Sequence, residues 1–276
     1  MAAEPVILDK ETHTFRQYED GDHLTTDFES QIFKEDTSHK CPVYIQRTPP
    51  CQGSCPSGHE IRGWLQIVRG IEKPETDMER DAYAFYRNTM ANPFPSIMGR
   101  VCPAPCQDGC NRNEVDDYVG INSVEQYIGD TALAANLQFQ DIPALGDKKV
   151  AIIGGGPGGM GAAYHLRRMG YASTVFDMQP ALGGMMRYGI PSYRVPRDTL
   201  DGENQRIVDM GGIEIKLNTK IGVDITVADL DKEFDAVIWA IGCQKGRGLP
   251  AANADAPNVI TAVEYLDAFN KGKLQT

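Results

Sequence analysis

The sequence predicts an α + α/β protein, in which a mostly helical N-terminal region precedes an α/β domain. Two observations favour this class. Cysteines come in two groups between residues 41 and 113, with a segment of helical periodicity between them. From Lys148 onward, short apolar runs alternate with helical stretches, a pattern typical of parallel sheets with crossover helices. We therefore expect two domains, residues 1–147 and 148–276, a division that suits the chain's length.

The N-terminal region divides into an arm, two helical segments and a linker. Residues 1–40 are polar and acidic without periodicity, and we expect an extended arm. Ile61, Trp64, Leu65 and Val68 recur at helical spacing and predict a helix. A second helix is expected over residues 124–137. Residues 138–147 should form the linker to the second domain.

The second domain shows the expected alternation of strands and helices. The short apolar run at residues 150–153 predicts a strand, and further strands are expected at residues 174–177, 212–217 and 236–240. A helix is expected over residues 160–169, directly after a glycine-rich turn. We find no internal repeat.

Composition excludes several function classes. The formal net charge is −11, which argues against binding to nucleic acid or to anionic membrane surfaces. A basic protein partner stays open, although a solvated acidic surface is the ordinary interpretation. No segment approaches the roughly 20 apolar residues of a membrane span, and the first residues lack the layout of a secretory signal. We therefore expect a cytoplasmic protein.

The glycine-rich turn contains the pattern G-x-G-x-x-G as Gly154, Gly156 and Gly159. The first glycine permits a tight turn, the second lets the backbone approach a pyrophosphate, and the third lets helix and strand pack closely. Asp177 ends the next predicted strand, where an acid can accept hydrogen bonds from ribose. The context predicts a Rossmann-like dinucleotide site; the alternative is a glycine turn without a ligand. The pattern itself does not distinguish NAD from FAD.

The clustered cysteines predict metal or cluster ligands, because cysteines in a reducing compartment seldom form disulfides. The groups are Cys51 and Cys55, followed by a proline, and Cys102, Cys106 and Cys110 at intervals of four. Iron–sulfur ligation is favoured by the tight spacing and the adjacent redox-type domain. Zinc and buried structural thiols are the alternatives. Cys243 stands alone, and we expect it to be a buried apolar filler.

Residues 183–191 and 193–196, with the sequences GGMMRYGIP and YRVP, resemble a signature of the glutamate synthase small-subunit family. In that family the loop lies along FAD, so the resemblance implies an FAD-binding domain. It places Gly184 and Met185 beside the flavin and Arg194 at the phosphate or ribose. Ala240 and Gly242 resemble the family's second short motif. The implied cofactor contacts also include Pro157, Gly158, Met178 and Ile221.

The cysteine segments resemble the cluster domain that this family shares with dihydropyrimidine dehydrogenases. The resemblance covers PPCQGSCPSGHEIRGWL and NPFPSIMGRVCPAPCQDGCNR and implies two 4Fe-4S clusters. One would use Cys51 and Cys110, and the other Cys55, Cys102 and Cys106. Glu125 falls where the family supplies a non-cysteine fourth ligand; a solvated helix carboxylate is the alternative.

The sequence departs from the family pattern at the first cluster. The family has two further cysteines where this chain has Val43 and Gln46. Cys41 could take over one ligand position, with a non-cysteine group such as His39 completing the site. Alternatively, that cluster is labile or missing.

The resemblance extends over about residues 38–276 and implies an NAD(P)H:acceptor oxidoreductase. Electrons would pass from NAD(P)H through FAD and the clusters to a partner protein or large subunit, in a hetero-oligomer. In the family, an NADPH-binding unit follows the segment matched by residues 258–274. We therefore expect either a fragment or a chain completed by another polypeptide. An electron-transfer subunit without its own hydride site and a redox-inert scaffold are the alternatives. The stretches TPPCQGSCPSG and GDHLTT weakly resemble the branch of the family that serves dissimilatory sulfur oxidation.

Overall fold

The computed structural model describes residues 48–73, 79–115, 119–248, 250–257 and 259–274. Contacts divide the chain into two compact units. The cysteine-rich unit comprises Met1–Ala91 and Pro103–Ile121, and the sheet unit comprises Asn92–Cys102 and Asn122–Thr276. The extended arm predicted for residues 1–40 lies outside the described residues. The predicted domain boundary after residue 147 follows the sequence motifs and stays a prediction.

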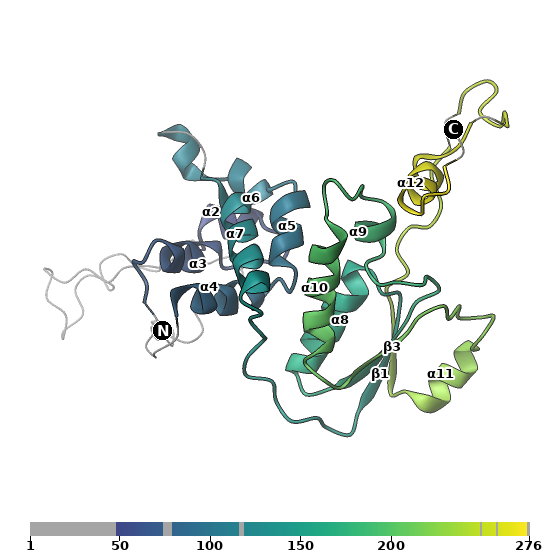
Figure 1. The fold of residues 1–276 in the computed structure, drawn as a ribbon, viewed down its shortest axis with the longest axis horizontal. Coiled ribbons are helices and arrows are strands. Elements are labelled where there is room, and N and C mark those ends of the chain that lie inside the picture. Colours follow the sequence, from purple (N-terminus) through teal and green to yellow (C-terminus); the bar gives the residue numbers. More distant parts are fainter. Residues whose placement is uncertain (1–47, 74–78, 116–118, 249, 258, 275–276) are drawn as a thin grey trace, which may run out of the picture. The chain divides into compact units, whose positions relative to one another are not determined.

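Short helices make up the described part of the cysteine-rich unit (Figure 1). They are α2 (Pro50–Ser54), α3 (Ile61–Val68), α4 (Arg80–Thr89), α6 (Pro105–Asp108) and the 3-10 helix η1 (Asn111–Glu114). The helix predicted over residues 61–68 is present as α3. Of its predicted apolar face, Ile61 and Trp64 are buried and Leu65 and Val68 are half-buried, and Ile67, which was not part of that face, is buried as well. Trp64 has no exposed surface. Helix α3 packs on α4, and α2 packs on α6.

The sheet unit combines a parallel four-stranded sheet with helices on both of its faces (Figure 1). Its elements are α5 (Pro95–Val101), α7 (Ile121–Ala134), β1 (Lys149–Ile153), α8 (Pro157–Arg168), β2 (Ala172–Phe176), α9 (Met185–Tyr188), α10 (Arg197–Val208), β3 (Ile213–Lys216), α11 (Val227–Glu233), β4 (Ala236–Trp239) and α12 (Ala262–Asn270). The strand order is β3-β2-β1-β4. The fold class predicted from the alternating pattern is thus confirmed.

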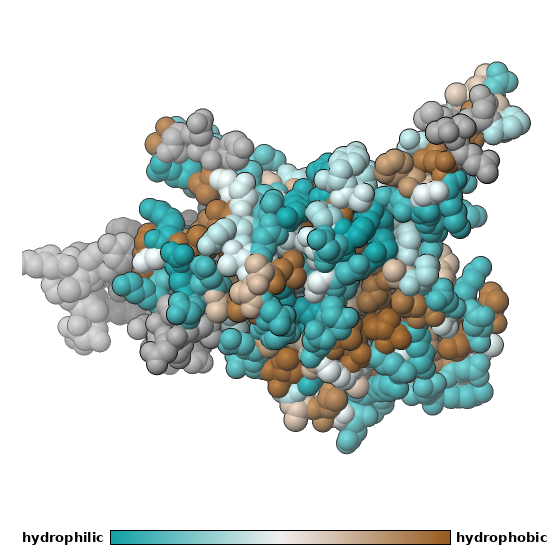
Figure 2. All heavy atoms as spheres, in the orientation of Figure 1, coloured by the Kyte–Doolittle hydropathy of each residue, from teal (hydrophilic) through white to brown (hydrophobic). Residues whose placement is uncertain are grey.

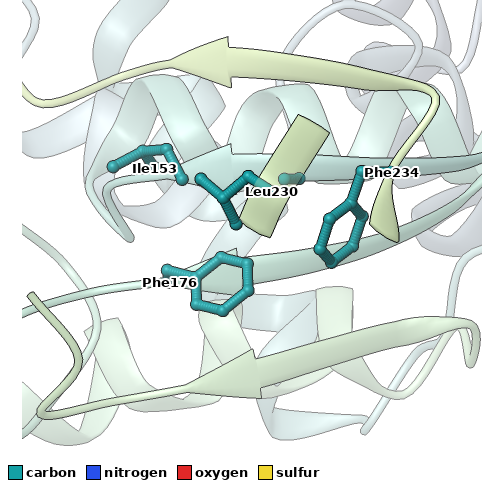
Figure 3. Close-up of a cluster of buried hydrophobic side chains, with 5 residues drawn as sticks. Ile153, Phe176, Leu230 and Phe234 are labelled. Carbon is teal, nitrogen blue, oxygen red and sulfur yellow. The ribbon is translucent and has the colours of Figure 1, made fainter. Parts of the chain in front are cut away.

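Alternating residues of β1 face opposite sides of the sheet, as the geometry of a strand requires. Ala151 and Ile153 pack with Phe176 of β2 and with Leu230 and Phe234 from the α11 segment (Figure 3). Ile152 faces the other side and lies against the first turn of α8. Both faces of β1 are therefore buried, which explains its continuous apolar sequence.

The outer strand β4 is less covered than β1. It pairs with β1, and its side chains Ala236 and Trp239 are exposed. Trp239 keeps 53% of its surface accessible. Figure 2 shows one face of the molecule, on which apolar residues interrupt a largely hydrophilic surface.

The expected strands agree with the structure within two residues at each end, whereas two predicted helices begin earlier. Helix α7 begins at Ile121 and α8 at Pro157. The helices that had not been predicted are α2, α4, α5, α6, α9, α10, α11 and α12 and the 3-10 helix η1. Within the described ranges, every helix falls short of the length and apolarity that crossing a membrane requires.

Candidate cofactor and cluster sites

The glycine-rich turn connects β1 to α8 and leaves no room for side chains at two of its glycines. Gly154 has a φ of +112°, and its N–H donates to Phe176 O at 2.7 Å. A Cβ at Gly154 would lie 2.3 Å from Ala240 O, and one at Gly159 would lie 1.8 Å from Gly154 O. The turn therefore depends on glycine at both positions. This arrangement matches the roles predicted for the first and third glycines of the fingerprint.

The start of α8 offers free backbone donors. Gly156 is the N-cap without a side-chain hydrogen bond, Pro157 begins the helix, and the first turn contains no acidic residue. The first N–H groups of a helix have no intrahelical partner, and the helix dipole favours an anion there. Gly158 is exposed beside them. These groups fit a pyrophosphate, which binds at such helix starts in dinucleotide-binding folds.

Asp177 lies directly beside the turn, where its carboxylate holds the backbone. Its Oδ2 accepts from Gly155 N–H at 2.7 Å, and its Oδ1 accepts from Gln179 N–H at 2.8 Å. The side chain is nearly buried. Each carboxylate oxygen can accept a second hydrogen bond, so the predicted contact with ribose stays open as a prediction.

The loop before α9 passes over the glycine-rich turn. Gly183 N–H donates to Gly155 O at 2.8 Å. Gly184 has a φ of +47°, and a Cβ there would lie 2.7 Å from Gly156 Cα. Gly155 and Gly183 were absent from the predicted site residues. The doubled glycines in both motifs were the signal that could have identified them.

The structure brings some of the other predicted contacts to this turn and places others elsewhere. Ala240 donates to Ile153 O and lies against Gly154, whereas Met178, Met185 and Gly242 are exposed. Ile221 packs against the hydrophobic cluster on the α11 side. The Arg194 guanidinium approaches Arg100 O of α5 at 3.5 Å. Contacts of these residues with a cofactor stay predictions.

Four of the predicted cysteine ligands lie in the cysteine-rich unit. Cys51 is in α2 and Cys55 follows it; Cys106 is in α6 and Cys110 precedes η1. Gly109 approaches α2 so closely that a Cβ would lie 2.3 Å from Ser54 Oγ. Burial raises the pKa of the Cys51 thiol, and the neighbouring Cys110 raises it further. The two thiols that the resemblance assigns to one cluster are therefore neighbours.

The turn between Cys102 and Cys106 contains a strained residue. Ala104 has φ +58° and ψ +50°, a left-handed conformation, and its side chain is buried. For a residue other than glycine this conformation costs about 1–2 kcal/mol. Ala104 O accepts from Gln107 N–H at 2.8 Å, which begins the turn of α6 that carries Cys106. Strain of this kind often marks a functional site.

Cys102 and Glu125 lie in the sheet unit. Cys102 follows α5, and its carbonyl accepts from Asn122 Nδ2 at 2.8 Å. Glu125 is a buried residue of α7, and its Oε1 accepts from Asn92 Nδ2 at 2.9 Å. Glu125 is thus not the solvated carboxylate that was the alternative. A ligand role for it stays a prediction.

The donor chemistry fits iron–sulfur clusters. Cys51, Cys55, Cys102, Cys106 and Cys110 are all free thiols, the ligands of 4Fe-4S clusters. In the described part of the chain, no three histidine, cysteine or acidic side chains are grouped to hold a single ion. Each thiolate of a four-iron cluster binds a different iron, so convergence on one point is not required. Cys41 and His39 lie outside the described residues.

Cys243 corrects one prediction. We expected a buried filler, but the residue is exposed. It follows β4, whose outer edge no described strand covers, so the chain beyond Trp239 runs over the surface.

Known proteins share both parts of the chain. Residues 25–137 match the family described as dihydropyrimidine dehydrogenase domain II, 4Fe-4S cluster. Residues 152–211 match the NAD(P)-binding Rossmann-like domain. The glutamate synthase [NADPH] small chain of Bacillus subtilis is 35% identical over 240 residues, which are 83% of this chain and 47% of that protein. Homologues of this chain thus include the glutamate synthase small chain, and the matched regions are a 4Fe-4S domain of the dihydropyrimidine dehydrogenase type and a Rossmann-like domain.

Other relatives carry other names. The beta subunit of the NADP(+)-dependent formate dehydrogenase of Moorella thermoacetica is 33% identical over 81% of this chain and 34% of its own length. The beta subunit of the NADPH-Fe(3+) oxidoreductase of Geobacter sulfurreducens is 34% identical, over 84% of this chain and 34% of its own length. The chain thus spans between a third and a half of these relatives. The predicted cofactor set of FAD, 4Fe-4S clusters and NAD(P)H fits the two matched domains.

Proposed function

We propose that this chain is the cluster- and flavin-binding part of an NAD(P)H-dependent oxidoreductase that passes electrons to a partner protein. The observation that carries the proposal is the presence, in one chain, of a 4Fe-4S domain and a Rossmann turn built for a dinucleotide. Oxidoreductase subunits are the relatives that combine these domains.

FAD is the proposed ligand of the glycine-rich turn. The free N–H groups at the start of α8 would bind its pyrophosphate, and Asp177 would keep the turn closed through Gly155. The loop at Gly184 lies against Gly156, and in the family this loop runs along the flavin. Bound FAD supplies the exchange between two-electron and one-electron chemistry.

The proposed cluster ligands are Cys51 and Cys110 for one cluster, and Cys55, Cys102, Cys106 and Glu125 for the other. Cys41 and a non-cysteine group such as His39 are proposed to complete the first. The relatives named as beta subunits support a protein partner, whose identity the chain does not indicate. The expected location in the cytoplasm and the kinship with the sulfur-oxidation branch stay predictions.

Iron, acid-labile sulfide and flavin analysis of anaerobically purified protein tests the proposal. We expect about four or eight iron atoms per flavin, for one or two 4Fe-4S clusters. The Cys106→Ser variant should lose about one cluster's iron, whereas Cys243→Ser, at an exposed cysteine, should retain the wild-type content. Flavin without iron, or zinc in place of iron, would contradict the proposal.

Reduction by NAD(P)H separates two forms of this function. Bleaching of the flavin on anaerobic addition of NADH or NADPH to the isolated chain would show that it carries its own hydride-accepting site. An iron-containing protein whose flavin only a partner can reduce would be an electron-transfer subunit.

A further inference from the structure

Glu203 is a fully buried carboxylate to which the proposed cofactor chemistry gives no part. It lies in α10, has no exposed surface, and accepts from Ser96 N–H at 2.7 Å and from Ile97 N–H at 3.1 Å. These two N–H groups belong to the first turn of α5. A buried acid is costly unless hydrogen bonds compensate it. Here the compensation comes from the helix that leads to Cys102.

Helix α5 is also fixed along its length by α7. A Cβ at Gly99 would lie 2.4 Å from Gln126 N, and one at Gly129 would lie 2.1 Å from Ser96 N, so the two helices touch through their backbones. Arg100 of α5 forms a two-pronged ion pair with Asp130 of α7, at 2.7 and 2.8 Å. A bidentate ion pair of this kind restricts the relative orientation of the two side chains and also stabilises their contact.

The far end of α5 is held by a separate contact. Asn122 Nδ2 donates to Cys102 O at 2.8 Å. The contact fixes the backbone of the proposed ligand itself, whereas Glu203 fixes the opposite end of the same short helix. Helix α10 packs against both α5 and α8, so it connects the helix that starts at the glycine-rich turn with the helix that ends at Cys102 (Figure 1).

We propose that Glu203 and Asn122 are positioning residues, which hold the two ends of α5 and thereby fix Cys102 with respect to the glycine-rich turn. The inference rests on the proposed function, in which Cys102 is a cluster ligand. Residues around a metal site that orient its ligands commonly tune its affinity and potential.

The test uses the full chain, purified anaerobically with its cofactors, and three variants. In Glu203→Gln an amide NH₂ group replaces one carboxylate oxygen, so one of the two α5 N–H groups loses its acceptor. Asn122→Ala removes the side-chain donor to Cys102 O. Asp209→Asn is the matched control, because Asp209 is exposed at the end of the same helix. The readouts are hydrogen exchange of the α5 amides and the EPR spectrum and midpoint potential of the reduced clusters.

We expect exchange at Ser96 or Ile97 to rise about tenfold in Glu203→Gln, as the loss of one such hydrogen bond implies. The cluster spectrum and potential should change in Glu203→Gln and Asn122→Ala and stay as in wild type in Asp209→Asn. Iron-containing variants with wild-type spectra and potentials would overturn the inference, even if exchange increases, because Glu203 would then be only structural. If Glu203→Gln does not fold, Asn122→Ala decides by the same criterion. Iron-free wild-type protein would instead overturn the proposed function, and this inference with it.

Discussion

Two buried ionisable residues, one in each compact unit, have shifted pKa values with the same physical cause. Burial raises the pKa of Glu203 to about 8, and burial lowers the pKa of His59 to about 4. In both cases the low-dielectric interior disfavours the charged form. His59 Nε2 lies 2.8 Å from Asn88 O, and since a carbonyl only accepts, Nε2 carries the proton of the neutral ring.

His59 should make the chain less stable in acid. The unfolded residue takes up a proton near pH 6.5, whereas the folded one does so only near pH 4. Stability is therefore present above pH 6.5 and is lost as the pH falls from 6.5 to 4, by on the order of 3 kcal/mol. Urea unfolding of wild type and His59→Gln across this range measures it. A variant that loses stability on acidification as steeply as wild type would refute the assignment.

Two glycines of α8 allow a test of how closely this helix packs against the glycine-rich turn. A Cβ at Gly159 would lie 1.8 Å from Gly154 O, whereas one at Gly161 meets nothing within 4 Å. Gly159→Ala should destabilise the chain by about 1–3 kcal/mol through overpacking and weaken flavin binding. Gly161→Ala should stabilise α8 by up to about 1 kcal/mol. Thermal unfolding and flavin titration of both variants measure the effects, and equal behaviour of the two would contradict the geometry.

At Ala104 we expect replacement by glycine to stabilise the protein, although replacement of alanine by glycine usually destabilises a protein. Because Ala104 is left-handed, with φ +58°, glycine should relieve strain there and stabilise the protein by up to about 1 kcal/mol. The same replacement inside a regular helix costs about 1 kcal/mol, so Ala162→Gly, in the interior of α8, is the control. The comparison needs only the unfolding midpoints of the two variants. Destabilisation by Ala104→Gly would show that the strain is absent.

An element could be predicted when its own residues showed a clear apolar pattern. The strand β1 was predicted closely because it is a short apolar run buried on both faces. The strand β2 begins two residues earlier than predicted, since its first half contains the polar Ser173 and Thr174. Helix α10 was missed, since its sequence RDTLDGENQRIV contains few apolar residues and buries the polar Glu203, Asn204 and Arg206 as well. Helices α11 and α12 carry a local signal of their starts, the capping boxes Thr226–Asp229 and Thr261–Glu264.

Across the two units, the sequence motifs predicted both kinds of site but could not indicate the tertiary contacts that hold the predicted residues in place. The glycine fingerprint and the cysteine spacing lie within short segments, so their chemistry could be inferred directly. The pairing of Glu203 with Ser96 joins residues 107 positions apart, and no local pattern indicates it. The same holds for Asn122 and Cys102, or for Asn92 and Glu125, whose partners are set by how α5 and α7 pack.

The division into two units also distributes the chain's intrinsic fluorescence. The sequence contains two tryptophans, and one lies in each unit: Trp64 without exposed surface in the cysteine-rich unit, and Trp239 about half exposed in the sheet unit. Iodide should therefore quench the red-shifted emission of Trp239 and spare the blue-shifted emission of Trp64. In Trp239→Phe the remaining emission should resist iodide until the cysteine-rich unit unfolds. Each unit thus carries its own optical reporter, and the loss of structure in one can be followed independently of the other.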